Sequence, residues 1–511
     1  MEEYKVLLTT SGIGSRLGTL TNFTNKSLVR ISDKPAISHI IEYYPKNIPF
    51  VVTIGHFGSY VRQFLKLAYP DRDFTFVDID KFEGPGSSLG YSILQAKNEL
   101  QCPFIFHASD TILTKNDIPI GVDSNWCVGS HQDDSSQYST FIVSNGDIDD
   151  INEKGAIHYD YCYIGMCGIK DYKLFWTELE NIPNTQSLSD IHIIKNMLLN
   201  VPFKFYETMG WFDTGNTSKL KKVQEFFKSG INILDKSDES IYFFKDFVIK
   251  FFANTTINKN RIKRASILKG LVPEIIGTDS NFYKYKKAEG KLFATSANVK
   301  SFTYFLDWVK DNLWKEKESD NFSKSCLDFY IHKTESRLNL YLNGVPDVSE
   351  TINGELIPPI QDLISQIDID WLCDGVPVQF HGDFILDNVI ETKDNFCLID
   401  WRQDFAGNLE VGDIYYDLAK LNHNLTVNHS IIDKKLYNSS PDNCYILCNS
   451  TLLRCKEVLH NFIKENGYNL KKVEILTSII WLNMAPLHEY PFNNFLFNFG
   501  KYNLYKTLNV S

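Results

Sequence analysis

The sequence predicts an α/β protein in two parts, an N-terminal mostly parallel sheet and a C-terminal α+β part with two lobes. In the first hundred residues, short β-rich segments alternate with longer amphipathic ones, and this pattern changes near residue 228. The chain has 511 residues, of which 43% are hydrophobic. At about 100 to 200 residues per domain, it is long enough for several domains with large cores.

The first part is expected to alternate between strands and helices. Expected strands are residues 5–10, 50–56, 74–79 and 104–110. Expected helices are residues 35–45, 60–69 and 87–100. Strands that alternate with helices in this way pair in parallel and are covered by helices on both faces of the sheet.

The boundary between the two parts is expected between about residues 230 and 240. A helix over residues 219–230 should end on Gly230, and the polar segment 231–240 follows it. Two strands should then meet at a Lys245-Asp246 turn. The predicted domains are residues 1–232 and 237–511. The second domain divides into a small β-rich lobe of about 237–295 and a helical lobe of about 296–511, interrupted by β-rich residues 376–401.

Composition excludes several functional classes. The formal net charge of −11, without basic runs, argues against a nucleic-acid partner. No segment approaches the roughly 18 consecutive apolar residues of a membrane span, and the acidic start MEEYKVLLTT is unlike a signal peptide, so we expect a cytoplasmic protein. The 10 cysteines form no CxxC pair, which argues against a disulfide framework or a zinc site.

A glycine loop with two cations follows the first expected strand. Residues 11–35 read SGIGSRLGTLTNFTNKSLVRISDKP. Gly12 and Gly14 let the backbone and Ser15 approach phosphate oxygens, while Arg16 and Lys26 supply positive charge. This string resembles the signature of the sugar-1-phosphate nucleotidyltransferases, which implies a Rossmann-like fold and a nucleotide substrate.

Four later segments fit the same resemblance. Residues 83–92, with Gly84 and Ser87, resemble the family's base-recognising loop. Lys154 lies in a segment like the family's EKP stretch, and the resemblance implies that it holds the phosphate of the incoming substrate. Asp110 ends an expected strand and Asp213 lies in the turn GWFDTGN, and both are expected to hold Mg²⁺.

The loop departs from the family pattern at three positions. Ser11 replaces a usual glycine, Thr19 a frequent proline, and Asn25 the proline that usually precedes the lysine. These changes affect the loop and base selection, whereas Arg16 and Lys26 are retained. The nucleoside triphosphate is therefore left open between CTP, UTP and dTTP.

The second part carries a different motif set. The sequence HGDFILDN is followed by IDW and then by GDIYYDLA, and this spacing resembles the aminoglycoside phosphotransferase and choline kinase family, relatives of the protein kinases. The resemblance implies that Asp383 accepts the proton of the substrate hydroxyl, and that Asn388 and Asp400 hold Mg²⁺ on ATP. We expect Asp413 to brace the catalytic loop and His381 to be structural.

The small lobe fits this family less well. Lys250 is positioned like the strand lysine that orients ATP phosphates, but no glycine-rich loop precedes it. Where the family tends to have a glutamate on the next helix, the sequence has Arg261, Lys263 and Arg264.

The sequence thus predicts a bifunctional enzyme with Mg²⁺ in both parts. The C-terminal part would phosphorylate a small sugar or alcohol with ATP. The N-terminal part would then transfer a nucleotidyl group to that phosphate and release pyrophosphate, giving a nucleotide-activated product for surface glycan synthesis or salvage. A choline kinase joined to a CTP:phosphocholine cytidylyltransferase is one alternative, and a regulatory, non-catalytic kinase-like part is another.

Two further points stay open in the sequence. Related nucleotidyltransferases commonly form oligomers, so a homo-oligomer is possible. Trp481, His488 and Tyr490 either line the acceptor pocket, where aromatic rings would suit a choline-like cation, or pack in the core.

Overall fold

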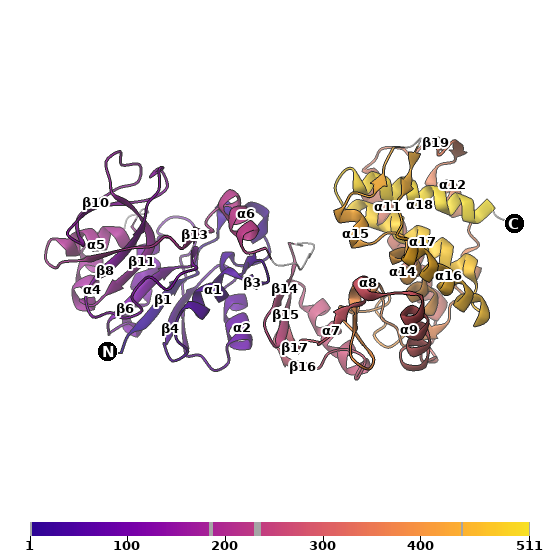
Figure 1. The fold of residues 1–511 in the computed structure, drawn as a ribbon, viewed down its shortest axis with the longest axis horizontal. Coiled ribbons are helices and arrows are strands. Elements are labelled where there is room, and N and C mark those ends of the chain that lie inside the picture. The colour runs from indigo at the N-terminus through magenta and orange to yellow at the C-terminus, as the bar shows by residue number, and fades with distance from the viewer. Residues whose placement is uncertain (1–2, 183–187, 229–236, 441–442, 510–511) are drawn as a thin grey trace. The chain divides into compact units, whose positions relative to one another are not determined.

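The computed structural model describes residues 3–182, 188–228, 237–440 and 443–509 (Figure 1). Contacts divide the chain into two compact units, one of Met1–Thr255 with Ile276–Tyr285 and one of Thr256–Ile275 with Lys286–Ser511. This division differs from the predicted boundary near residue 232, because most strands of the predicted small lobe group with the first unit. The predicted helix end at Gly230 lies outside the described residues.

Within the described residues, the first unit is built on a nine-stranded sheet. In spatial order its strands are β5 (Phe74–Asp78), β4 (Phe50–Ile54), β1 (Lys5–Thr9), β6 (Phe104–Ala108), β11 (Tyr161–Ile169), β8 (Trp126–Ser130), β12 (Lys204–Glu207), β10 (Asp147–Asn152) and β9 (Thr140–Ser144). The first four strands pair in parallel, as expected from the alternation of strands and helices.

The sheet as a whole is mixed rather than mostly parallel, which corrects the prediction. β11 runs antiparallel to both β6 and β8, and β9 pairs with β10 as a hairpin. A short hairpin connection can only join antiparallel strands, whereas a parallel pair needs a longer crossover. The unbroken run of parallel strands ends at β6, where the regular alternation of strands and helices also ends, and β8 and β12 form a further parallel pair.

Helices cover both faces of this sheet. They are α1 (Ala36–Tyr43), α2 (Gly58–Ala68), α3 (Leu89–Gln95), α4 (Tyr172–Asn181), α5 (Asp190–Leu198) and α6 (Thr217–Phe226). Val6 and Leu8 of β1 belong to a core with α1 and α2, while Leu7 between them belongs to a second core with α4 and α5. Figure 1 shows these two helix pairs on opposite sides of the central strands.

A second, four-stranded sheet shares the core of the first unit. Its strands, in spatial order, are β14 (Glu239–Phe243), β15 (Phe247–Phe252), β17 (Phe282–Lys286) and β16 (Ile275–Thr278). Tyr242 and Phe282 are fully buried in the same apolar core as Phe64 of α2. The rings of Phe64 and Tyr242 lie 5.3 Å apart. The Tyr242 hydroxyl donates a hydrogen bond to the carbonyl of Leu28 at 2.8 Å.

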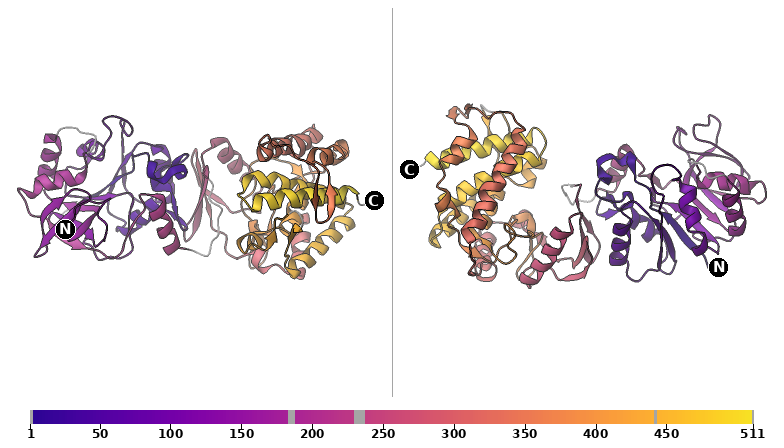
Figure 2. Two further views of the ribbon diagram at one scale, coloured as in Figure 1. Left: turned by 90° about the horizontal axis from the view of Figure 1, so that it is seen from above. Right: turned by 180° about the vertical axis from the view of Figure 1, so that it is seen from behind.

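The second unit is mainly helical. Its longer helices are α7 (Thr255–Ile267), α9 (Val299–Asn312), α11 (Lys333–Leu342), α14 (Ile414–Asn424), α16 (Ser450–Glu465), α17 (Leu470–Met484) and α18 (Phe492–Asn509). Shorter helices are α8 (Phe293–Ser296), α10 (Phe322–Leu327), α12 (Ile360–Ser365), α13 (Ile369–Cys373) and α15 (His429–Asp433). Figure 2 shows α18, the yellow helix at the C-terminus, beside α17, which is buried from Ile475 to Leu482.

Short strands interrupt these helices. They are β18 (Lys291–Leu292), β21 (Pro377–Val378), β22 (Val389–Glu391), β23 (Phe396–Leu398) and β24 (Gly412–Asp413), with the hairpins of β19 (Glu350–Ile352) and β20 (Glu355–Ile357) and of β25 (Tyr437–Asn438) and β26 (Tyr445–Ile446). Three of them, β21, β22 and β23, lie in the predicted β-rich residues 376–401. Across the described part of the chain, no helix combines the length and apolar character that crossing a membrane requires.

Candidate active sites

The glycine loop after β1 brings its lysine close to the backbone. Gly14 adopts a left-handed conformation with φ of 69°. A β-carbon on this residue would lie only 2.9 Å from Cβ of Lys26. Glycine therefore meets two requirements here, because it adopts positive φ without strain and leaves room for Lys26.

Two of the departures from the family pattern hold this loop in place. The buried Asn25 side-chain amide donates to the carbonyls of Thr10 at 2.8 Å and His56 at 2.6 Å. The Ser11 hydroxyl lies 2.9 Å from the hydroxyl of Ser92 on α3. Proline at position 25 or glycine at position 11 would lack these side-chain hydrogen bonds, so these departures add local contacts.

A short two-stranded sheet brings the two predicted metal-binding aspartates together. β7 (Thr111–Leu113) pairs antiparallel with β13 (Trp211–Asp213), and this pairing sets Asp213 opposite Thr111. Thr214 then donates its backbone N–H to the carbonyl of Asp110 at 2.9 Å. Asp110 and Asp213, which are 103 residues apart in sequence, are thereby neighbours, as predicted.

Gly215 marks the point where the charged side chains converge. A β-carbon added at this glycine would lie 2.9 Å from Oδ1 of Asp213. It would also lie 3.3 Å from Nη2 of Arg16 and 3.4 Å from Oδ2 of Asp110. Any side chain at position 215 would thus fill the space around which these three groups gather.

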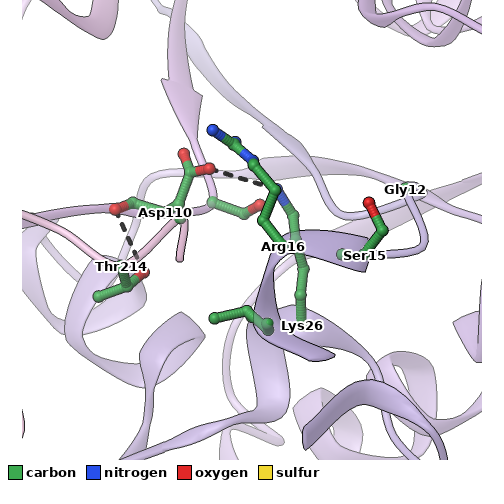
Figure 3. A pocket seen from close by; sticks show the side chains of 10 residues that line it. Gly12, Ser15, Arg16, Lys26, Asp110 and Thr214 are labelled. Atoms are coloured by element: carbon green, nitrogen blue, oxygen red, sulfur yellow. Dashed lines mark hydrogen bonds and ion pairs between the residues drawn. The ribbon is translucent and has the colours of Figure 1, made fainter. Parts of the chain in front are cut away.

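Asp110 is held in its charged form by the predicted cations. Its Oδ2 lies 3.5 Å from Nζ of Lys26, and Figure 3 shows both side chains pointing into one cavity. The Lys26 ammonium lowers the pKa of Asp110, with help from Arg16 and against the opposing effect of burial. The cavity, of about 160 Å³, is lined by Gly12, Gly14, Ser15, Arg16, Leu17, Lys26, Ser109, Asp110, Thr214 and Gly215.

The structure adds two groups that sequence reasoning missed. Nζ of Lys219 lies 2.7 Å from Oδ2 of Asp213. The Tyr138 hydroxyl donates to the same oxygen at 2.8 Å, and burial together with the Asp213 charge raises the pKa of this phenol. Lys219 follows Asn216, which caps α6 by accepting a hydrogen bond from the Lys219 N–H at 3.0 Å. The asparagine cap after the WFDTG turn is the sequence signal for this first-turn lysine.

Four residues predicted for this site do not line the cavity. They are Asp213, which accepts the N–H of the lining residue Gly215, and Lys154, Gly84 and Ser87. Lys154 is exposed in the connection between β10 and β11. Gly84, with φ of 76°, and Ser87 form a turn before α3 in which the Ser87 hydroxyl donates to the Gly84 carbonyl at 2.7 Å. Their roles in holding phosphate and base remain predictions.

In the second unit, Asp417 braces the HGD loop. Its carboxylate accepts the backbone N–H groups of His381 at 2.8 Å and Gly382 at 2.7 Å. Asp413, predicted to do this, instead accepts the N–H of Val376 at 3.0 Å and the hydroxyl of Tyr330 at 2.8 Å. The prediction for Asp413 was therefore wrong, because α14 directs the second aspartate of the GDxxxD motif toward the loop. His381 is fully buried, as expected for a structural residue.

The three predicted kinase residues lie together. The Asn388 side-chain amide donates to the carbonyl of Asp383 at 2.8 Å and to its carboxylate at 3.3 Å. Ile399 donates its N–H to the carbonyl of Asn388 at 2.8 Å, and this places Asp400 beside the pair. Asp400 has a φ of 56°, an uncommon conformation for a residue other than glycine.

A lysine that sequence reasoning missed pairs with the predicted base. Nζ of Lys420, on α14, lies 2.7 Å from Oδ1 of Asp383. Burial raises the pKa of Asp383, but the charge of Lys420 and its hydrogen bond outweigh this effect and bring the pKa to about 2. Asp383 is therefore ionised at neutral pH.

Helix α7 anchors the same region with arginines. Nη1 of Arg261 lies 2.5 Å from Oδ1 of Asp400. Arg264 is fully buried, and its guanidinium donates to the backbone carbonyls of Phe380, His381, Arg402 and Leu409. Burial lowers the pKa of Arg264 to about 9. Two of the three cations noted in the sequence, Arg261 and Arg264, thus bind the IDW and HGD segments directly.

The other residues considered for the second site lie in β15, in α17, or between α17 and α18. Lys250 is buried in β15, opposite Ile241 of β14, and its role toward ATP remains a prediction. Trp481 is buried in α17, whereas Tyr490 is 78% exposed and thus does not pack in the core. The ring of His488 packs against Phe492 with centroids 4.9 Å apart.

The donor groups fit Mg²⁺ in both regions. Among the described residues, no group of three or more histidine, cysteine or acidic side chains could hold a metal. Mg²⁺ typically takes one or two carboxylates and completes its shell with phosphate oxygens and water. In the first unit, such oxygen donors are provided by Asp110 and Asp213, next to a cavity that can accept phosphates. In the second unit, they are provided by Asp400 and the side-chain amide of Asn388, next to cations suited to phosphates.

Comparisons with known proteins match only part of the chain. No protein-family description matches it, and no curated protein matches it. A CTP:phosphocholine cytidylyltransferase from Streptococcus pneumoniae is 18% identical, with a TM-score of 0.40 over 44% of this chain and 100% of that protein. An inositol-1-phosphate CTP transferase from T. maritima is 17% identical, with a TM-score of 0.37 over 45% and 98%. A UDP-glucose pyrophosphorylase from Acinetobacter baumannii is 16% identical, with a TM-score of 0.37 over 44% and 93%. The matched part lies in the N-terminal half.

Proposed function

We propose that the chain is a bifunctional transferase acting on a small sugar or alcohol. The C-terminal part phosphorylates a hydroxyl with ATP, and the N-terminal part transfers a nucleotidyl group to that phosphate. The observation that carries the proposal is the convergence of Arg16, Asp110 and Asp213 around Gly215, next to Lys26. Asp110 and the two cations line one small cavity, and Asp213 contacts the lining residue Gly215, so that two carboxylates and two cations are available for nucleotidyl transfer.

In the N-terminal site, the chain's own residues neutralise and align phosphates. Lys26 and Arg16 hold the oxygens of the transferring phosphate while the acceptor phosphate attacks and pyrophosphate leaves. Asp110 and Asp213 would hold Mg²⁺, which supplies further charge neutralisation on the triphosphate. Lys219 and Tyr138 fix one oxygen of Asp213 and so orient its carboxylate.

The test of this site is pyrophosphate release by the full-length protein. Each of CTP, UTP and dTTP is supplied with a panel of sugar phosphates and phosphocholine, and Asp110→Asn is compared with Asp149→Asn. Asp149 is an exposed carboxylate on β10 and serves as the matched control. Asp110→Asn should lose at least 100-fold in rate while the control keeps its rate. Equal rates in the two variants would contradict the proposal, and release only from CTP with phosphocholine would favour the choline alternative.

In the C-terminal site, Asp383 is the proposed acceptor of the substrate hydroxyl proton. Its low pKa keeps it anionic and able to accept a hydrogen bond from the hydroxyl, while Lys420 holds it in position. Asn388 and Asp400 would hold Mg²⁺ on the ATP phosphates. Loss of ADP formation in Asp383→Asn, with pyrophosphate release unchanged, is the expected result.

One observation favours a second candidate for this half. Arg261 forms an ion pair with Asp400, so that a cation already neutralises a predicted metal ligand. A regulatory domain that binds nucleotide without transferring phosphate would accommodate this pair. ADP formation that is equal in wild-type protein and Asp383→Asn would favour the regulatory candidate over the kinase.

A further inference from the structure

Four cations gather beside the HGD loop of the second unit. They are Lys333, Arg337, Arg402 and Lys420, and we call them the basic cluster. Nζ of Lys333 lies 4.1 Å from the centre of the Phe329 ring, and Cζ of Arg402 lies 4.8 Å from the centre of the same ring. Lys333 also lies 5.9 Å from the ring of Tyr416. Lys333 and Arg402 are thus brought together by one aromatic side chain.

The basic cluster reaches the predicted base directly. Lys420 contacts the carboxylate of Asp383 at 2.7 Å. Arg402 donates its backbone N–H to His381 at 3.0 Å. Its side chain passes so close to Gly382 that a β-carbon there would lie 2.7 Å from Cβ of Arg402. Two of the four cations, Lys420 and Arg402, therefore contact the loop that carries Asp383.

The cluster has more positive charge than its surroundings neutralise. Within the described residues, Lys420 pairs with Asp383, whereas no carboxylate lies within 4.0 Å of Lys333, Arg337 or Arg402. Nε of Arg402 is buried without a hydrogen-bond partner in the same set of residues. Burial, followed by the charges of Arg402 and Lys420, lowers the pKa of Lys333 well below its usual value. Cations held together in this way are suited to an anionic ligand.

Polar atoms that lack partners lie on the neighbouring helices. Asn483 donates to the hydroxyl of Thr334, the residue after Lys333, at 2.9 Å, while its Oδ1 has no partner among the described residues. Nε1 of Trp481 and Nδ1 of His423 are also buried without partners there, and their rings lie 6.3 Å apart. Buried polar atoms of this kind normally have hydrogen-bond partners, so this side of the basic cluster has unused donor and acceptor capacity.

We propose that the acceptor of the C-terminal part carries an anionic group, a carboxylate or a phosphate, in addition to the hydroxyl that is phosphorylated. This inference rests on the proposed kinase function and names its substrate class. Lys333 and Arg402 bind the anionic group, and Arg337, one helical turn after Lys333 on α11, adds to the positive charge. A choline-like cation would be repelled by the same residues.

The transfer step balances with this acceptor. The acceptor hydroxyl oxygen forms a bond to the γ-phosphorus of ATP, and the bond from that phosphorus to the bridging oxygen of ADP breaks. The hydroxyl proton passes to Asp383 and then to solvent. The anionic group takes no part in bond making, and it orients the acceptor so that its hydroxyl faces Asp383.

Calorimetric binding to the full-length protein, saturated with Mg²⁺ and a non-hydrolysable ATP analogue, tests the inference. The bound analogue fills the γ-phosphate position, so anion binding there does not contribute. Probes are D-glucuronate for the carboxylate, D-glucose 6-phosphate for the phosphate, D-glucose as the neutral reference, and D-glucosamine and choline as cations. At least one anionic probe should bind ten or more times as tightly as D-glucose. Equal binding of the anionic probes and D-glucose, or tighter binding of either cation, would overturn the inference.

Variants locate the anion site. Lys333→Met should remove the preference for the anionic probe, and Lys333→Arg should restore it. Lys324 is exposed, and Lys324→Met is the matched control, which should leave the preference for the anionic probe unchanged. A preference that survives in Lys333→Met would contradict the assignment. Failure of the kinase proposal would be distinguishable from failure of this inference. In that case no probe would lead to ADP formation, but the anionic probe would still bind to the wild-type protein and lose its preference in Lys333→Met.

Discussion

At the scale of single residues, Gly215 is the position where the smallest change should have the largest effect on the N-terminal site. The groups around it already lie within 2.9 to 3.4 Å of the place that a β-carbon would take. Asp213 is fixed by strand pairing, and its Oδ1 accepts the N–H of Gly215 at 2.6 Å, so this carboxylate has little freedom to move aside.

We therefore expect Gly215→Ala to reduce pyrophosphate release by about 100-fold, since a misplacement of about 1 Å can cost that much. The fold should persist, because the glycine lies beside a cavity rather than in a core. Steady-state rates with each nucleoside triphosphate, together with thermal unfolding, check this expectation. An active Gly215→Ala variant would show that the converging charges are not the reaction centre.

Lys420 should control the ionisation of Asp383. The folded-state pKa of Asp383 is about 2, below its ordinary value of 3.8, so the stabilisation from this pair is present above pH 4 and is lost as the pH falls toward 2. In Lys420→Met, burial acts without this opposing charge, and the pKa of Asp383 should rise above 3.8.

The acid limb of the pH profile for ADP formation lies below pH 4 in the wild-type protein, and in Lys420→Met it should rise by at least one pH unit and appear at the acid end of the measured range. Profiles of kcat/KM between pH 4 and 8 measure this shift, and Lys420→Arg, which keeps the charge, is the control. An unchanged acid limb would mean that another group than Asp383 governs the reaction.

At the scale of elements, some site residues could be predicted from the sequence and others could not. That Asp110 and Asp213 should meet is expected from the family resemblance, because Mg²⁺ on a triphosphate needs one or two carboxylates. Lys219 has a sequence signal in the Asn216 cap that precedes it, whereas Lys420 has none, since a lysine on an amphipathic helix usually faces solvent. The direction of Asp417 rather than Asp413 toward the HGD loop depends on how α14 begins, and the motif spacing alone does not set it.

Helix α7 provides the clearest prediction for an element. Its Arg261 contacts Asp400 at 2.5 Å and competes with a metal ion for that carboxylate. Arg261→Gln should therefore raise the affinity for Mn²⁺, used as a spectroscopic probe for Mg²⁺, by about tenfold, which corresponds to about 1.4 kcal/mol. Titration followed by electron paramagnetic resonance measures the affinity in the presence of ATP.

Lys263→Gln, a change at a neighbouring cation of α7, is the control and should leave the affinity unchanged. Weaker metal binding in Arg261→Gln would mean that the arginine supports the site rather than competing for it. The regulatory alternative would then lose the observation that favours it.

At the scale of the whole molecule, the four-stranded sheet decides where the chain can be divided. The pattern of hydrophobic and polar residues changes near residue 230, and this change suggests a domain boundary between residues 232 and 237. In the structure, however, Tyr242, Phe251 and Phe282 share one buried core with Phe64 of α2. Hydrogen bonds cross the same contact, since Asn281 donates its N–H to the side chain of Gln63 at 2.9 Å.

Separating these sheets would expose the aromatic face of α2. A fragment of residues 1–232 should therefore be less stable and bind a hydrophobic dye, whereas a fragment of residues 1–290 should behave like the first unit of the intact chain. Phe64→Ala in the full chain should cost about 3 to 5 kcal/mol of unfolding free energy for this unit, as expected for a large buried aromatic side chain. Phe226→Ala, at a side chain that is 63% exposed, is the control and should cost much less.

Denaturant unfolding of the two variants, compared with that of the two fragments, checks the prediction. Equal stability of the two fragments would show that the shared core contributes little and that the boundary suggested by the sequence is the physical one.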